Sequence, residues 1–281
     1  MAALASIPSK AQAAILQTFL KLDSTATRLS VLLSTPTGID KFMLTIYYTL
    51  KLLYPQISRL RALRLQHHLS TFLIKASSAL LPGESLVAVL QLSKTDERLA
   101  EADKSMRLAA AMIGEFRMIT RLWGMLTMYR WAKGTWLSPP GDAVVRGCTW
   151  GQIAACSVYQ VLENVAYLAG KGIIRSERLG PEAQKAMWLW SCRAWSVHTI
   201  LEAVSLLRQR QVKEQKGEKG EVETKKAEEQ AWWRSWFVNA AYAPMAVHYS
   251  VENGLFSDDH LGVLGLIVGY NTFGHMWAQT A

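Results

Sequence analysis

Apolar residues recur every three or four positions along most of the chain, which is the spacing of one face of an α-helix. A half-buried strand would instead alternate apolar and polar residues, and no such run of useful length occurs in the sequence. We therefore predict an all-α fold built from many helices. The predicted helices cover residues 10–22, 38–54, 96–133, 147–168, 182–208, 232–251 and 260–281.

Proline, glycine and capping residues mark the ends of several of these helices. Residues 36–38, Pro-Thr-Gly, separate the first two, and Pro55 is expected to break the chain before a stretch without a clear amphipathic pattern. Ser93 and Asp96 resemble a capping box that opens the next helix, and Gly134 is the predicted stop of that helix.

The segment from Arg107 to Leu126 carries two chemically opposite faces. At 100° per residue, six apolar side chains fall within an arc of about 80°, and three arginines fall within a similar arc on the opposite side. This pattern suits a helix lying flat on a membrane, with its apolar face in the acyl boundary and its guanidinium groups among anionic headgroups. The alternative is the core face of a bundle helix whose arginines are solvated. The apolar residues are Leu108, Met112, Phe116, Ile119, Trp123 and Leu126, and the basic residues are Arg107, Arg117 and Arg121.

Positive charge is concentrated in the first half of the chain. The net charge is +9, and residues 1–149 hold 18 Lys and Arg against 9 Asp and Glu, whereas residues 150–281 hold 13 of each. A basic region joined to an apolar region rich in Trp indicates a cytosolic face against anionic lipid. Nucleic acid is disfavoured as a partner, because no zinc-finger, helix-turn-helix or RNA-binding signature accompanies the charge. We accordingly divide the chain into a basic N-terminal region, 1–149, and an apolar membrane region, 150–281.

The second region contains a charged spacer and two candidate membrane segments. Residues 208–231 hold 7 basic and 6 acidic residues, and we predict a solvated spacer, either disordered or a frayed helix. Residues 260–281 are free of charged side chains over a length that suits a span or a deep hairpin arm, and 147–174 is a second candidate. Gly265 and Gly269 form a small-xxx-small pair that predicts close helix packing or oligomerisation.

Few polar residues suggest a chemical site. Glu163 and Asn164 lie inside an apolar helix, where they predict either a hydrogen-bonded contact between helices or part of a pore lining. His248 and Glu252 are four apart, and we interpret them as a pair that stabilises a helix rather than as metal ligands. No phosphate-binding loop, dinucleotide motif or nucleophile elbow is present. We predict a protein that is not an enzyme and uses neither a cofactor nor a metal.

Three strings of residues, in the same order, resemble a known family. The first is Thr37-Gly38-Ile39-Asp40-Lys41-Phe42 running into LTIYYTLKLL, and the second is LENVAYL at 162–168 followed by GKGII. The third is the stretch HYSVENGLFSDDHLGVLGLIVGYNTFGHMW, in which a His-aromatic pair precedes a glycine-rich apolar helix. Together they resemble the peroxisomal biogenesis factor 11 family, and most closely its shorter gamma-like branch.

The resemblance implies an all-α protein of the peroxisomal membrane. It implies a non-enzymatic role in which an amphipathic helix of the N-terminal half binds and curves the membrane, so that peroxisomes elongate, proliferate and divide. It also implies self-association or pairing with paralogues, a fission adaptor and a dynamin-type GTPase as partners. The alternative function is a metabolite pore or transport component of the same membrane, for which Glu163 and Asn164 would be the polar lining.

Overall fold

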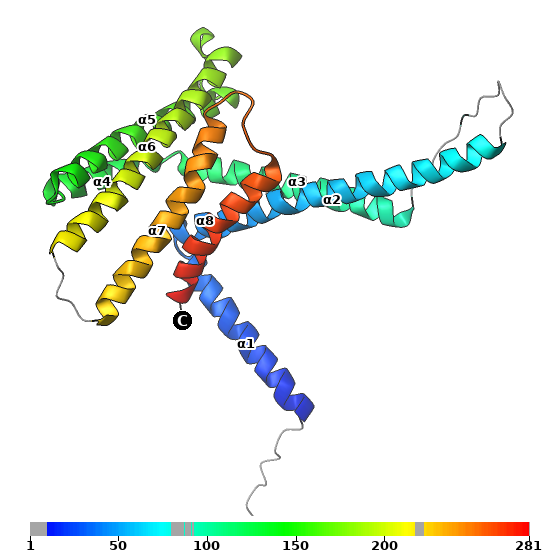
Figure 1. The fold of residues 1–281 in the computed structure, drawn as a ribbon, viewed down its shortest axis with the longest axis horizontal. Helices are drawn as coiled ribbons and strands as arrows, with labels where there is room; N and C mark the ends of the chain where they lie inside the picture. The colour runs from blue at the N-terminus through cyan, green and yellow to red at the C-terminus, as the bar shows by residue number, and fades with distance from the viewer. Residues whose placement is uncertain (1–9, 80–86, 88–90, 92, 217–221, 281) are drawn as a thin grey trace, which may run out of the picture.

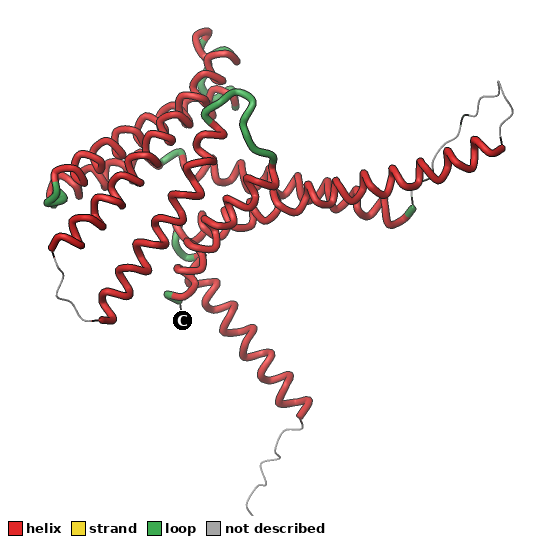
Figure 2. The backbone as a smooth tube through the Cα atoms, viewed as in Figure 1, coloured by secondary structure: helices red, strands yellow, loops and turns green. Residues whose placement is uncertain are grey.

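The fold is described from a computed structural model, which covers residues 10–79, 87, 91, 93–216 and 222–280. These residues form helices and connecting turns without a strand, which confirms the predicted all-α class (Figures 1 and 2). In chain order the elements are α1 (Lys10–Leu33), α2 (Pro36–Ala79), α3 (Lys94–Arg121), α4 (Gly124–Leu137), α5 (Ala143–Gly170), the 3₁₀ turn η1 (Glu177–Leu179), α6 (Pro181–Lys216), α7 (Val222–Tyr249) and α8 (Asp258–Ala278).

The helices form a bundle from which two arms project (Figure 1). α5 and α6 make the most extensive helix pair, and α7 and α8 continue the bundle from α6. α8 packs along α2, and α2 leaves the bundle together with α3 as one arm, while α1 projects as the other. The C-terminal end of α1 is tied down, because Arg28 Nη2 donates to the carbonyl of Trp277 over 2.7 Å and its guanidinium lies 4.5 Å from the centre of the Trp277 ring.

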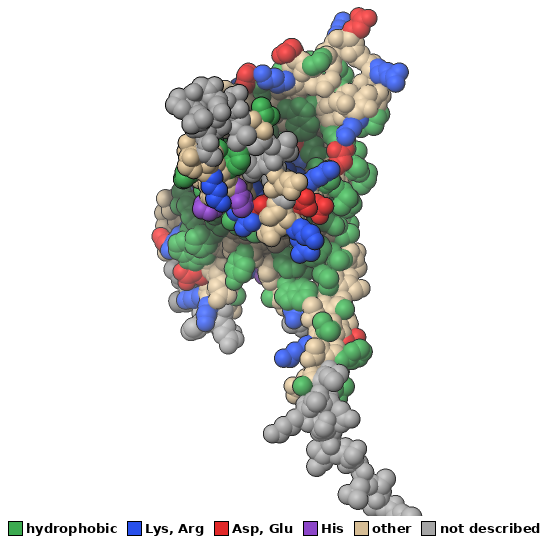
Figure 3. All heavy atoms as spheres, turned by 90° about the vertical axis from the view of Figure 1, so that its right-hand side faces the viewer, with side chains coloured by type: hydrophobic (Ala, Val, Ile, Leu, Met, Phe, Trp, Pro, Cys, Tyr) green, Lys and Arg blue, Asp and Glu red, His purple; other side chains and the backbone are tan. Residues whose placement is uncertain are grey.

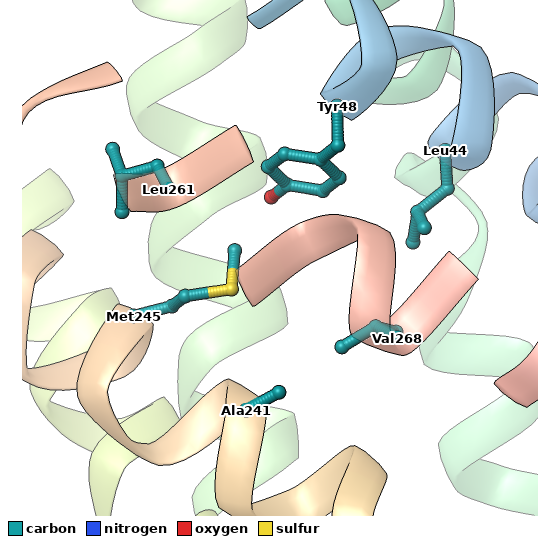
Figure 4. Close-up of a cluster of buried hydrophobic side chains, with 6 residues drawn as sticks. All are labelled: Leu44, Tyr48, Ala241, Met245, Leu261 and Val268. Atoms are coloured by element: carbon teal, nitrogen blue, oxygen red, sulfur yellow. The ribbon is translucent and has the colours of Figure 1, made fainter. Parts of the chain in front are cut away.

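An apolar core lies where α2, α7 and α8 meet (Figure 4). Glycines let α8 approach α2 closely, since a Cβ at Gly265 would lie 2.0 Å from Tyr48 Cγ and one at Gly269 would lie 2.8 Å from Thr45 Oγ1. Both glycines therefore pack helices within one chain, and the face predicted for oligomerisation is covered by α2. The core side chains are Leu44 and Tyr48 of α2, Ala241 and Met245 of α7, and Leu261 and Val268 of α8.

Two prolines mark α2. The predicted boundary at 36–38 is confirmed, since α1 ends at Leu33 and Pro36 is the first residue of α2, where its missing N–H costs nothing. Pro55, which was expected to break the chain, lies inside the 44-residue α2 and does not break it. Contacts on both sides hold the helix together, because Tyr54 donates to Asp258 of α8 over 2.5 Å and Ser58 donates to Asp103 of α3 over 2.9 Å.

The predicted helix 96–133 is two helices. Its start is confirmed, since Ser93 is the N-cap and its Oγ accepts the Asp96 N–H over 3.2 Å. The first helix, however, ends at Arg121, and Gly134 lies inside α4 rather than stopping a helix. The prediction was wrong because side chains of α5 donate to the carbonyls of Arg121 and Leu122 and so interrupt a sequence that is locally suited to one helix.

The charged spacer is largely helical where it is described. α6 continues to Lys216 and α7 begins at Val222, while 217–221 lie outside the described residues. Charge pairing supports these helix ends, through Arg210 with Glu214 four residues on and through Lys213 with Glu228 across the two helices.

The predicted membrane spans are not confirmed. Within the described part of the chain, no helix combines the length and the apolar character that crossing a bilayer requires. The predicted segments 260–281 and 147–174 correspond to α8 and α5.

Candidate membrane-contact surface

The apolar stripe predicted at 107–126 lies on the outside of the protein. Its first four members lie on α3, Trp123 lies in the turn after α3, and Leu126 lies on α4. Their exposed fractions run from 39% for Phe116 to 69% for Met112, so these side chains do not form a core in the described chain. Hydrophobic side chains are also widespread on the face that Figure 3 shows. The six exposed members are Leu108, Met112, Phe116, Ile119, Trp123 and Leu126.

Two of the three arginines of the same helix point inward, which corrects the expectation that all three lie among lipid headgroups. Arg117 Nε donates to Asp40 of α2 over 3.1 Å, and Arg121 pairs with Glu163 of α5 at 3.2 Å. Arg107 is exposed, and its Nε donates to Asp103 of α3 itself over 3.1 Å. Acids of α2 and α5 therefore draw only Arg117 and Arg121 to the inner face.

The contact between Arg117 and Asp40 affects the pKa of the Asp40 carboxyl group. Burial raises the pKa of Asp40, but the positive charges of Arg117 and Lys41 outweigh that effect and hold this pKa below its usual value. Asp40 lies in the second turn of α2.

Most of the basic side chains of α2 pair with acidic side chains, and all of these acids except Asp40 lie on other helices. Along the arm, Arg61 pairs with Asp103 at 3.1 Å and Arg64 pairs with Asp96 at 2.6 Å. Hydrogen bonds from Arg64 and Ser93 lower the pKa of Asp96 to about 2. The other pairs are Lys41 with Asp40, Lys51 with Asp258 and Arg59 with Asp259. Much of the positive charge seen in the sequence therefore holds helices together.

The α5–α6 pair also buries polar side chains and exposes apolar ones. Polar side chains are buried beside apolar ones such as Ile153 and Leu206. Gln152 donates to Glu202 over 2.6 Å between α5 and α6, and Asn239 of α7 donates to the carbonyl of Thr199 of α6 over 3.0 Å. Apolar side chains point outward, with exposed fractions between 43% and 63%. The exposed residues are Val158 and Val161 of α5 and Val197, Ile200, Val204 and Leu207 of α6. A polar inside and an apolar outside are typical of helices surrounded by lipid.

Glu163 and Asn164 both contact the junction between α3 and α4. Glu163 accepts a hydrogen bond from Tyr159 over 2.8 Å in addition to its pairing with Arg121. Asn164 Nδ2 donates to the carbonyl of Leu122 over 2.9 Å. These contacts match the hydrogen-bonding interpretation of the pair. The cavities of about 590 Å³ beside His248 and about 950 Å³ beside Trp232 lie elsewhere, and neither is lined by Glu163 or Asn164.

Sequence reasoning missed two polar residues of the same helix. Gln152 and Gln160 are buried on the inner face of α5, in line with Asn164. Their spacing of multiples of four residues within an otherwise apolar helix was the signal that could have identified them.

His248 and Glu252 do not form the predicted helix pair. α7 ends at Tyr249, and Glu252 accepts a hydrogen bond from Lys185 of α6 over 3.0 Å. His248 Nδ1 instead accepts the backbone N–H groups of Leu255 and Phe256, over 2.8 and 2.9 Å. Among the residues with described positions, no group of three His, Cys, Asp or Glu side chains is placed to hold a metal ion.

Comparison with known proteins gives one family and one distant relative. The sequence matches the family described as Peroxisomal biogenesis factor 11 (PEX11) over residues 85–270, which is more than half of the chain. It is also similar to an uncharacterized protein of Schizosaccharomyces pombe, with 32% identity over 167 residues that cover 59% of this chain and 73% of that protein. No solved structure matches the chain. The family match includes α3 to α7 and much of α8.

Proposed function

Because this chain belongs to the peroxisomal biogenesis factor 11 family, with the general role in peroxisome biogenesis that membership gives, we propose that it binds and curves the peroxisomal membrane through α3 and α4. The observation that carries the proposal is the outward position of the apolar stripe, from Leu108 to Leu126. A helix face that enters one leaflet expands that leaflet and favours curvature. Elongation of the organelle before proliferation and division follows from that curvature.

The size of the stripe is sufficient for membrane binding. Full burial of six such side chains is worth roughly 9–18 kcal/mol at ~1.5–3 kcal/mol each, which is an upper bound because interfacial insertion is shallow. The helix is already folded against α2, so less conformational entropy is lost on insertion than for a disordered peptide.

Attraction to anionic lipid needs cations other than Arg117 and Arg121, which face inward. Lys104 of α3 and Arg130 and Lys133 of α4 are exposed. We assign the headgroup contact to these residues, each worth about 1 kcal/mol near an anionic surface. The apolar stripe then supplies most of the affinity.

Phe116→Asp tests this proposal on the full-length protein. The residue is exposed, so the fold should tolerate the change, whereas a charge in the acyl boundary opposes insertion. We expect binding to vesicles of phosphatidylcholine and phosphatidylserine to fall at least about tenfold, and tubulation seen by electron microscopy to be lost. Ile173→Asp is the matched control, because Ile173 is equally apolar and 69% exposed but lies outside the stripe, after α5. Wild-type tubulation by Phe116→Asp would contradict the proposal.

The alternative function, a metabolite pore, has less support. Its polar lining was to be Glu163 and Asn164, which are engaged in contacts with the α3–α4 junction. Conductance in planar bilayers that is lost in Glu163→Gln, with folding retained, would favour the pore over membrane curving.

The remaining parts of the proposal concern arrangement and partners. We propose that α8 enters the membrane as part of a hairpin, that the basic N-terminal region faces the cytosol, and that the chain works with itself or paralogues, a fission adaptor and a dynamin-type GTPase. Protease treatment of intact peroxisomes tests the orientation, since a cytosolic N-terminal region would be digested. Alkaline carbonate extraction tests insertion, since a merely adsorbed protein would leave the membrane pellet.

A further inference from the structure

The junction between α3 and α4 interrupts the helical hydrogen-bond ladder in the middle of the apolar stripe. The Leu122 N–H bonds to the carbonyl of Ile119 over 3.1 Å, and the Leu126 N–H bonds to that of Trp123 over 3.0 Å, so both bonds span three residues instead of four. Trp123 has φ −98° and ψ 16°, outside the usual helical values. The stripe is therefore divided into a part on α3 and a part that begins at Trp123.

Side chains of α5 hold this break. Gln160 Nε2 donates to the carbonyl of Arg121 over 2.5 Å, and Asn164 Nδ2 donates to the next carbonyl, that of Leu122, over 2.9 Å. Gln160 also donates to Asn164 Oδ1 over 3.1 Å, which keeps the two amides together. Two consecutive backbone carbonyls at the break are thus satisfied from another helix instead of by the next turn.

The local sequence does not require a break here. Leu122 and Trp123 are acceptable in a helix, and Gly124 only weakens one. Gly124 instead makes room for the amide, because a Cβ at this position would lie 2.3 Å from Gln160 Oε1. The break is therefore imposed by a tertiary contact with α5.

We infer that Gln160 and Asn164 are positioning residues for membrane contact: they fix the break between α3 and α4 and so set how the two parts of the stripe are presented to one membrane surface. This inference rests on the proposed function. The same contact joins the stripe to α5. A movement of Trp123 on insertion into lipid would therefore also move α5 and the bundle that it belongs to.

The first experiment measures the distance between α3 and α4 across the break, without lipid. The native cysteines Cys148, Cys156 and Cys192 are replaced by Ser, and spin labels are attached through Lys104→Cys on α3 and Lys133→Cys on α4, both exposed sites. Electron-spin distance measurements on the full-length protein in detergent report the separation. In one unbroken helix the two positions would lie about 44 Å apart.

We expect one narrow distance distribution in the parent protein. Gln160→Leu combined with Asn164→Leu should broaden it or shift it toward about 44 Å, because the carbonyls lose their donors and return to helical bonding. Gly124→Ala should act in the same direction from the other side of the contact, since its methyl group displaces Gln160. Gly124→Ala keeps both amide side chains, so it still tests the contact if the double variant does not fold.

Gln152→Leu is the matched control. Gln152 is the same residue type on the same helix and is as buried as Gln160, but it bonds to Glu202 of α6 rather than to the break. An unchanged distribution in the Gln160 and Asn164 variant, or an equal change in Gln152→Leu, would overturn the inference.

Vesicle tubulation is then compared among unlabelled proteins that keep Lys104, Lys133 and the native cysteines and carry only the substitutions at Gln160 and Asn164 or at Gln152. We expect a severalfold loss in the Gln160 and Asn164 variant and none in Gln152→Leu. A changed break with unaltered tubulation overturns the positioning role alone. Wild-type protein that folds but does not deform vesicles overturns the proposed function, whatever the distance measurement shows.

Discussion

The protein has two interiors of different character. Where α2, α7 and α8 meet, Leu44, Met245 and Val268 are almost fully buried in an apolar core. Where α5 meets α3, α4 and α6, Gln152, Gln160 and Glu163 are buried together with small and aliphatic side chains, and several valines and an isoleucine face outward. Helical periodicity is clear in α4 and α5 but weak along α2, α7 and α8. Where periodicity is clear it locates the two faces of a helix, but the surroundings decide which face points inward.

The two interiors are stabilised by different forces. The apolar core gains roughly 1.5–3 kcal/mol for each fully buried large side chain, and it suffers when packing is disturbed. Each hydrogen bond of the polar interior contributes only about 0.5–1.5 kcal/mol, but a buried partner that is left unpaired is costly. Substitutions should therefore distinguish the two regions by the kind of damage they do.

The largest expected effect is in the polar interior. Arg121→Met leaves Glu163, which is 5% exposed, without its cation. We expect a loss of about 3 kcal/mol in the free energy of unfolding, at the lower end for a broken buried pair because Arg121 is itself partly exposed. Adding Glu163→Leu should restore most of that loss. Chemical denaturation in a fixed detergent measures both, and a double variant as unstable as the single one would show that packing, not charge pairing, supports this region.

A smaller effect is expected at the apolar core. Gly265→Ala places a methyl group against the ring of Tyr48, so we expect a loss of about 2 kcal/mol from overpacking between α2 and α8. Gly274→Ala, in the same helix, has no neighbour within 4 Å of the added carbon and should leave stability unchanged or raise it by up to about 1 kcal/mol. Equal thermal midpoints for the two variants would mean that α8 does not pack on α2 through its glycines.

The smallest effect is a pH dependence at the start of α5. Hydrogen bonds from Arg208 and from the Val145 N–H lower the pKa of Asp142 to about 2, from an ordinary value of 3.8. Because this pKa is lower in the folded state, the stabilisation is present above pH of about 4 and is lost as pH falls toward about 2. Asp142→Asn should make the thermal midpoint less sensitive to pH over that interval. An unaltered pH profile in this variant would indicate that the contact between Asp142 and Arg208 does not support the α5–α6 pair.

Sequence patterns found the parts of the fold that depend on neighbours along the chain. The helices, the Ser93 cap and the position of the apolar stripe follow from local spacing. The partner of Arg117 could not be found this way, because Asp40 lies 77 residues earlier. The break at Leu122 and the continuity of α2 through Pro55 also depend on tertiary contacts, which no local propensity encodes.

The contact between Arg28 and the end of α8 has a consequence for biosynthesis. The two residues are 249 positions apart, so a ribosome must translate nearly all of the described chain before this hydrogen bond exists. Until then the exposed leucines and Phe19 of α1 lack the restraint that fixes the direction of that helix. A product truncated before Trp277 would lack this hydrogen bond, so α1 can dock on the end of α8 only after α8 has been translated.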